Sequence, residues 1–210
     1  MVSKERPKDP TRDRDADFRD RVRTKLLAAA EAIIANEGYA AVQARRVATE
    51  AGCAIGTIYN IYGDIDGLIL AANTRTLSDL AVALKDAQNR GEGQDLEARL
   101  MSLANAYLDF ATLNQLRWRA VFEHRLPDDY PIPQAFLDDR RGLLALIESE
   151  IGDTGPSDPE ERQDAARALF SATHGNVLLA LDAKLGPFEP DRCERQIRFL
   201  VHHVVIGLGR

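Results

Sequence analysis

Four side chains that can form hydrogen bonds stand close together in the short segment AIGTIYNIY, residues 54–62. They are Thr57, Tyr59, Asn60 and Tyr62. Hydroxyl groups bind phosphate oxygens and fix the register of a protein on a nucleic acid, and an amide such as that of Asn60 can read the edge of a base. This chemistry favours nucleic-acid recognition. A helical corner that only packs is the alternative.

Three isoleucines alternate with these polar residues. Ile58 is expected to anchor the segment to a core, whereas Ile55 and Ile61 are either core residues or contacts to thymine methyl groups. Ile55 and Gly56 therefore join the candidate DNA contacts at the start of the segment.

The elements before this segment predict a helix-turn-helix. An apolar stripe at spacings of three and four residues starts at about Phe18 and predicts a helix that Gly38 ends. A short helix is expected over about 43–51, and Gly52 supplies the turn before another short helix over about 54–62. The last helix can then protrude into a major groove. The stripe consists of Val22, Leu26, Ala29, Ala30, Ile33 and Ile34.

The run GYAAVQARRVATEAGCAIGTIYNIYGDIDGL, residues 38–68, resembles the DNA-binding domain of the TetR/AcrR family of transcriptional regulators. Downstream, FSATHGNVLLAL (170–181) is similar to the Trp-His-Gly signature of one subclass of this family, with Phe170 or Ala172 near the tryptophan position. The resemblance implies a ligand pocket among the middle helices, whose occupant changes the spacing of two DNA-binding heads. The matching residues of the first run are Gly38, Tyr39, Val47, Ala48, Ala51, Gly52, Gly56, Thr57, Ile58, Tyr59, Tyr62 and Leu68.

Several positions depart from the family pattern and remove expected contacts to the DNA backbone. Val42 and Gln43 replace the usual Ser or Thr, Ala54 and Ile55 replace a Ser and a basic residue, and Ile65 replaces a phosphate-binding Lys. Gln43 remains a candidate DNA contact. We expect seven arginines to supply the missing contacts, although Arg45 and Arg46 could equally be solvated surface. The seven are Arg12, Arg14, Arg19, Arg21, Arg23, Arg45 and Arg46.

The rest of the chain predicts helices alone, because no segment alternates as a half-buried strand does. Asp64 is expected to cap the first of these helices, and three prolines exclude a helix interior from 125–133. The fold class is all-α with about nine helices. We expect a disordered charged arm (1–16), a helix-turn-helix DNA-binding domain (17–64) and a helical ligand-sensing and dimerisation domain (65–210). The expected helices of this last domain are about 65–88, 95–113, 115–125, 134–151, 159–185 and 190–208.

The last two predicted helices carry apolar stripes and small residues that favour a four-helix bundle across a two-fold axis. Part of each stripe must also pack inside its own subunit. The expected dimer contacts are Ala165, Leu169, Ala172, Ile197, Val201, Val204, Val205 and Leu208.

Aromatic and polar side chains between the head and these helices are the candidates for an effector site. They could equally be core residues, and a satisfied buried hydrogen bond is the alternative for His174 and Asn176. Arg117 and Arg119 could meet an anionic ligand or face solvent. The candidate ligand-binding residues are Tyr107, Phe110, Trp118, Phe122, His174 and Asn176.

Composition and missing motifs reduce the number of functional classes that fit the sequence. The chain has 210 residues and a net charge of −6, all of it carried by residues 71–210, since residues 1–70 hold eleven basic and eleven acidic side chains. The four histidines lack metal-ligand spacing, and no phosphate-binding loop or nucleophile motif is present, so we expect no enzyme, metal or cofactor. Without a signal peptide or a membrane-spanning run, a cytoplasmic protein is expected.

Together these features predict a sequence-specific DNA-binding regulator. It would be a homodimeric repressor that binds a near-palindromic operator and is released by an unknown small-molecule effector. The alternative is a ligand-binding or interaction protein of the same fold with weakened DNA binding.

Overall fold

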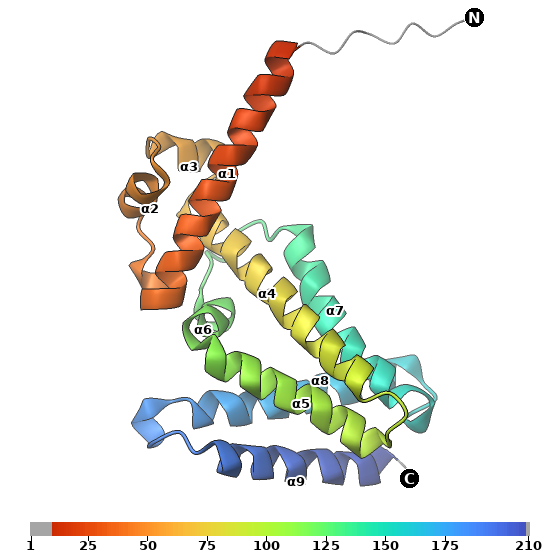
Figure 1. The fold of residues 1–210 in the computed structure, drawn as a ribbon. Coiled ribbons are helices and arrows are strands. Elements are labelled where there is room, and N and C mark those ends of the chain that lie inside the picture. The colour runs from red at the N-terminus through yellow and green to blue at the C-terminus, as the bar shows by residue number, and fades with distance from the viewer. Residues whose placement is uncertain (1–9, 209–210) are drawn as a thin grey trace, which may run out of the picture.

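The computed structural model describes residues 10–208, which form nine α-helices, three short 3-10 segments and no strand (Figure 1). This confirms the all-α prediction. The α-helices are α1 (Pro10–Glu37), α2 (Ala44–Ala51), α3 (Gly56–Tyr62), α4 (Ile65–Arg90), α5 (Leu96–Leu113), α6 (Gln115–Glu123), α7 (Gln134–Ile151), α8 (Pro159–Ala180) and α9 (Pro190–Leu208).

Helices α1, α2 and α3 form a head at one end of the molecule, where α1 packs against α4 and α6 of the larger body (Figure 1). The stripe predicted on α1 supplies much of the head's core, and Leu26, Ile33 and Ile34 are 0–2% exposed. Val47 of α2 and Ile58 of α3 are fully buried against it. The anchoring role predicted for Ile58 is thereby confirmed.

Helix α1 begins at Pro10, well before the expected start at Phe18. The prediction that residues 10–16 belong to a disordered arm is therefore wrong. Residues 10–17 lack an apolar stripe, so periodicity gives no signal there, and proline suits the first turn of a helix. The disorder predicted for residues 1–9 falls outside the described residues, as do the side chains of Arg12 and Arg14.

Two glycines shape the head. Gly52 adopts the left-handed conformation (φ 68°) at the end of α2, which turns the chain toward α3 as predicted. A Cβ atom on Gly67 would lie 2.2 Å from the carbonyl oxygen of Tyr62, so only glycine allows α4 to start so close to the end of α3. Asp64 caps α4, as expected, by accepting a hydrogen bond from the amide of Gly67 at 2.7 Å.

The body is built around α4, on which α5 and α7 pack, while α8 and α9 lie against each other beneath α5 (Figure 1). Helix α8 ends at Ala180 instead of about 185, because Asp182 caps a separate 3-10 turn, Ala183–Leu185. The other predicted bounds in the body agree with the structure to within two residues.

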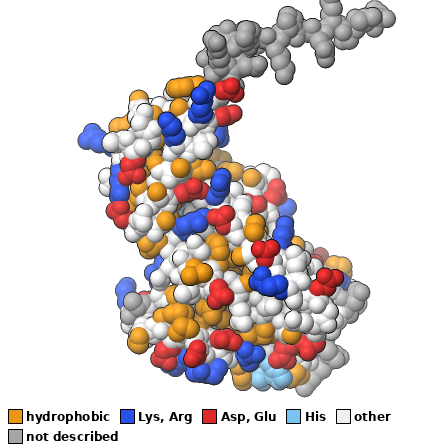
Figure 2. Space-filling model, in the orientation of Figure 1, with side chains coloured by type: hydrophobic (Ala, Val, Ile, Leu, Met, Phe, Trp, Pro, Cys, Tyr) orange, Lys and Arg blue, Asp and Glu red, His pale blue; other side chains and the backbone are white. Residues whose placement is uncertain are grey.

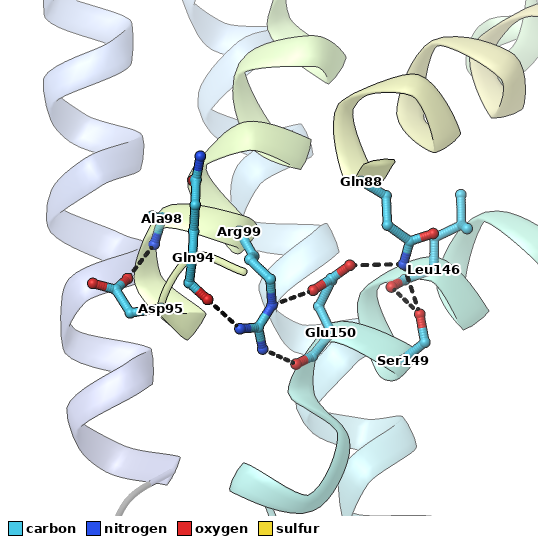
Figure 3. Close-up of polar contacts among 8 residues, drawn as sticks. All are labelled: Gln88, Gln94, Asp95, Ala98, Arg99, Leu146, Ser149 and Glu150. Carbon is cyan, nitrogen blue, oxygen red and sulfur yellow. Dashed lines mark hydrogen bonds and ion pairs between the residues drawn. The ribbon is translucent and has the colours of Figure 1, made fainter. Parts of the chain in front are cut away.

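A buried carboxylate ties three elements together at the far end of α4 (Figure 3). The Nε of Arg99 on α5 lies 2.6 Å from an oxygen of Glu150 on α7, whose side chain is 8% exposed. Gln88 of α4 donates to the other oxygen at 2.7 Å. Arg99 also donates to the carbonyl oxygens of Glu150 and Gln94, so the α4–α5 loop is fixed against the end of α7.

The visible face carries basic and acidic side chains interleaved over both head and body (Figure 2). A mixed surface of this kind produces no strong field of one sign, in agreement with the balanced charge of residues 1–70. Within residues 10–208, none of the helices is both long and apolar enough to span a bilayer.

Candidate nucleic-acid interface and ligand cavity

The outer face of α3 presents the polar side chains that the sequence singled out. Tyr59 is 52% exposed, Ile55 at the turn before α3 is 38% exposed, and Asn60 is also exposed. Thr57 is half-buried. Gly56, at the first turn of α3, is exposed and leaves this end of the helix without a side chain. A protruding helix with this composition fits a major groove, where an amide can bond adenine and hydroxyls can bond phosphates.

Tyr62 does not share this outer face. Its hydroxyl donates a hydrogen bond to the carbonyl oxygen of Arg23 on α1 at 2.9 Å, and the guanidinium of Arg23 lies 5.6 Å from the ring centroid. Burial raises the pKa of Tyr62. The ring therefore fastens α3 to α1, and its one hydroxyl proton is used inside the head. A contact of Tyr62 with DNA stays a prediction.

The two arginines of α2 have different surroundings. Arg46 donates to Glu37 at 2.8 Å and to Glu50 at 2.9 Å, so it joins the end of α1 to α2 and is not free to replace a phosphate contact. Arg45 is exposed, and Gln43 is exposed at the N-cap position of α2 without capping it. Arg45 and Gln43 therefore remain available to DNA.

Helix α1 runs beside α3 and extends its outer face. Phe18, Arg19 and Val22 of α1 line one surface hollow of about 450 Å³ together with Thr57 and Asn60. Phe18 is 65% exposed. Arg19, Arg21 and Arg23 are exposed as well, so the basic residues expected near the DNA lie on a helix and not on a loose arm. Sequence patterns could not predict this adjacency, since it depends on how α1 crosses α3.

A second site lies in the body, where α4, α6, α7 and α8 surround a cavity of about 660 Å³. This volume falls in the range of small-molecule pockets. Of the six predicted ligand-binding residues, Phe122 and His174 line it. The full lining is Leu77, Val121, Phe122, Phe136, Arg140, Leu143, Leu144, Arg167, Phe170, Ser171 and His174.

Tyr107 and Trp118 stand directly behind His174. The indole Nε1 of Trp118 donates to the hydroxyl of Tyr107 at 2.9 Å, and that hydroxyl lies 2.7 Å from Nδ1 of His174. Because indole can only donate, the phenol oxygen accepts from it. When the phenol gives its own proton to Nδ1, the neutral imidazole carries its proton on Nε2; in the other tautomer Nδ1–H donates to the phenol oxygen. Burial lowers the pKa of His174, which favours the neutral form.

The other two predicted ligand residues lie elsewhere. Phe110 is 9% exposed within the core. Asn176 donates to the carbonyl of Ala172 in its own helix and lines a different hollow beside α9. Neither residue lines the 660 Å³ cavity, because helical spacing cannot show which of two faces borders a cavity.

The arginines near the aromatic cluster also differ from expectation. Arg117 pairs with Asp79 at 2.6 Å, and Arg119 donates to the carbonyl oxygen of Leu181 at 2.9 Å. The cavity is lined instead by Arg140 and Arg167. Sequence reasoning missed both, because each sits among several charged residues on a helix and only tertiary packing distinguishes it from them.

Four polar contacts join the head and the N-terminal half of α4 to α6 and to the loop that follows α6. We call them the head–body joint. Tyr39 donates to the carbonyl oxygen of Glu123 at 3.1 Å, and Asn73 to that of Ala120 at 3.1 Å. Nε2 of His124 lies 2.9 Å from Asp66, and Tyr130 donates to Asp64 at 2.7 Å. Since Val121 and Phe122 of α6 line the cavity, the joint lies within one helical turn of it.

The last two helices present a different face to solvent from the one predicted. Ile197 and Val201 are fully buried and Leu169 is 5% exposed, all within their own subunit. Their prediction as dimer contacts is therefore wrong, since one stripe cannot pack inside and outside at once. Phe199 is 67% exposed and Ile206 is 45% exposed on the opposite side of α9. Ala165, Ala172, Val204, Val205 and Leu208 are partly buried.

Comparisons with known proteins match two stretches of the chain to family models. Residues 26–72 match the model of the tetR family of bacterial regulatory proteins, and residues 100–204, half of the chain, match the tetracyclin repressor-like C-terminal domain. The chain belongs to the TetR family. Its function is therefore DNA-binding transcriptional regulation.

Relatives of this TetR-family chain are distant in sequence. It is 24% identical over 169 residues to an uncharacterised HTH-type transcriptional regulator of Mycobacterium tuberculosis, a match that covers 80% of this chain and 74% of the relative. Two solved structures share its fold. A Rhodococcus sp. RHA1 protein of unknown function has a TM-score of 0.71, 22% identity and coverage of 90% and 96% of the two chains. A putative TetR-family regulator of Mesorhizobium loti has a TM-score of 0.65, 18% identity and coverage of 90% and 97%.

Proposed function

We propose that this chain is a ligand-released repressor that binds a near-palindromic operator as a homodimer. The observation that carries the proposal is the exposed face of α3, on which Tyr59 and Asn60 face outward while Ile58 is fully buried. One such helix reads only a few base pairs, so two copies spaced one helical turn apart are needed for a specific site.

In this proposal Asn60 reads a base edge, Tyr59 and Thr57 bind phosphate oxygens, and Ile55 contacts a thymine methyl group. Gln43 and Arg45 of α2 and Arg19 of α1 bind the flanking backbone. Tyr62 and Arg46 hold the head together and are left out of the interface.

The dimer is proposed to form through the solvent-facing sides of α8 and α9. Four large apolar side chains on α8, on α9 and in the 3-10 turn between them are 45–67% exposed, and α8 adds the small, half-buried Gly175. Small residues permit close approach of two helices, and exposed apolar groups of this size mark an interface. The four are Leu179, Leu185, Phe199 and Ile206.

Effector binding is assigned to the 660 Å³ cavity. A ligand there would touch Phe122 one turn from the head–body joint, so it can favour a different position of the head. To release DNA it must bind the non-DNA conformation better by about 1–3 kcal/mol or more. The likeness to the Trp-His-Gly subclass is also a proposal, supported by the rings of Phe170 and His174, which stack at 5.8 Å.

The test is a footprint over the DNA upstream of the chain's own gene, repeated with a panel of metabolites. Specific protection of a near-palindrome that one metabolite abolishes is expected. Binding that is blind to sequence and lost with added salt would instead favour a helical interaction protein with weakened DNA binding, a reading to which the internal ion pairs of Arg46 lend some support.

A further inference from the structure

The cavity in the body is lined by apolar side chains and by positively charged ones. Its walls are largely apolar, with Leu77, Phe122, Phe136 and Phe170 from four different helices. Two charged side chains also line it, Arg140 from α7 and Arg167 from α8, and no carboxylate is among the lining residues that the structure describes. The cavity therefore combines apolar walls with two positive charges on neighbouring helices.

Several arginines of the body are paired with carboxylates, whereas Arg140 and Arg167, like Arg90, Arg125, Arg162 and Arg195, are absent from the ion pairs that the structure describes. Arg99, Arg117 and Arg141 each lie within 4 Å of a carboxylate, at 2.6, 2.6 and 3.3 Å respectively. Neither Arg140 nor Arg167 has such a carboxylate partner among the side chains that the structure describes, those of residues 17–152, 154–182 and 184–208. Two guanidiniums at one cavity without a counter-charge are a ready site for a bound anion, since arginine binds carboxylate, sulfonate and phosphate groups through paired N–H donors.

His174 adds a neutral donor to the same wall. The hydrogen bond to Tyr107 occupies its Nδ1, and in the tautomer in which Tyr107 donates to Nδ1 the ring proton is on Nε2. A neutral imidazole donates one hydrogen bond without adding a third charge. The side chains at this cavity can therefore donate to a ligand from three residues, and the hydroxyl of Ser171 can donate from a fourth.

Resting on the proposed function, we propose that the effector is an amphipathic anion. Its apolar or aromatic part fills the space between Phe122, Phe136 and Phe170. Its single carboxylate, sulfonate or phosphate group binds Arg140 and Arg167. Both arginines are exposed. A cationic effector would therefore be repelled by two like charges, and a neutral one would gain no charge-assisted hydrogen bond from either guanidinium.

Two matched probes test this chemistry on the full-length protein. Anilinonaphthalene sulfonate is an aromatic anion, and phenylnaphthylamine has the same rings without the sulfonate. The chain contains one tryptophan, Trp118, whose ring centroid lies 5.5 Å from that of Phe122 and 5.2 Å from that of His174. Energy transfer from Trp118 therefore reports probe bound at this cavity and discriminates against probe bound far away.

We expect the sulfonate probe to bind at least about tenfold more tightly than the neutral probe at low salt. Arg140→Gln and Arg167→Gln should each weaken the sulfonate probe about threefold to tenfold and change the neutral probe less than about twofold. Arg141→Gln is the matched control, because Arg141 lies on the same helix, pairs with Asp138 and is not part of the cavity lining. It should leave both probes unchanged.

Equal binding of the two probes, equal losses for both in the arginine variants, or no energy transfer from Trp118 in the unchanged protein would overturn the proposal. The footprint on operator DNA is read separately. Protection of a near-palindrome by a protein that fails the probe test would overturn the effector chemistry alone. Failure to protect any specific site would overturn the proposed function, whatever the probes show.

Discussion

Single side chains of α3 divide by burial into those that hold the head and those that face outward. Ile58 is fully buried, Tyr62 is bonded to α1, and Asn60 and Tyr59 point to solvent. The sequence predicts most of this division, because a helix of known period has only one face that can pack. The sequence could not place Tyr62. The direction of a tyrosine at the border of the two faces depends on which hydrogen-bond acceptor lies nearby, and the sequence does not show that acceptor.

Asn60→Ala is expected to weaken operator binding about tenfold or more without changing the melting temperature, because a base-edge contact is lost while the buried face of α3 is unchanged. A gel shift on the footprinted operator measures the effect. Asn89→Ala, an exposed asparagine at the far end of α4, is the control and should bind normally. Equal affinity of both variants would remove Asn60 from the interface.

The buried imidazole of His174 predicts a pH dependence of stability. Its pKa is lowered by burial, so between that pKa and the ordinary value of about 6.5 the unfolded chain binds a proton that the folded protein does not. The free energy of unfolding should therefore fall as the pH drops below about 6.5, by at most about 1.4 kcal/mol per pH unit from this group.

Urea denaturation from about pH 7.5 to about pH 5 measures this loss. His174→Gln should flatten the profile. Parallel profiles for the unchanged protein and His174→Gln would contradict the assignment of a neutral ring.

At the scale of helices, the sequence predicts where most elements begin and end but not what surrounds them. The bounds of α4 to α7 follow from periodicity, the Asp64 cap and the prolines of 125–133. The dimer stripe on α9 was misassigned because the most apolar face of a helix is the one that packs inside its own subunit. The face left for a proposed partner carries isolated large apolar groups such as Phe199 between charged residues. Such isolated groups indicate an interface less clearly than a continuous apolar stripe does.

The Arg99–Glu150 pair gives a prediction about how elements are held together. Arg99→Ala should lower the free energy of unfolding by about 2–3 kcal/mol, because it leaves the carboxylate of Glu150 with Gln88 and without a counter-charge. Chemical denaturation measures the change. Arg141→Ala removes a pair whose side chains are 70% and 56% exposed and should cost less than about 0.5 kcal/mol. Similar losses of unfolding free energy in the two variants would mean that the buried Arg99–Glu150 pair stabilises the protein no more than the exposed pair does.

At the scale of the whole molecule, two copies must present their α3 helices to one side of a duplex, which the α8–α9 faces are proposed to arrange. Phe199→Glu should convert the dimer to a folded monomer at micromolar concentration, because a charge replaces a side chain that a partner would bury. Sedimentation measures the mass, and circular dichroism confirms the fold. Val82→Glu, at a 60% exposed position of α4, should remain dimeric. A dimer in both variants would place the interface elsewhere.

The head–body joint has a consequence for how such regulators diversify. Two of its four acceptors, at Ala120 and Glu123, are main-chain carbonyls of α6, and every amino acid provides one. The side chains of Val121 and Phe122 between them are turned to the cavity. If the effector binds this cavity as proposed, substitutions at these two positions alter which molecule is recognised and still leave the main-chain contacts to the head in place. A new effector specificity can then arise at α6 without a compensating change in the DNA-binding domain.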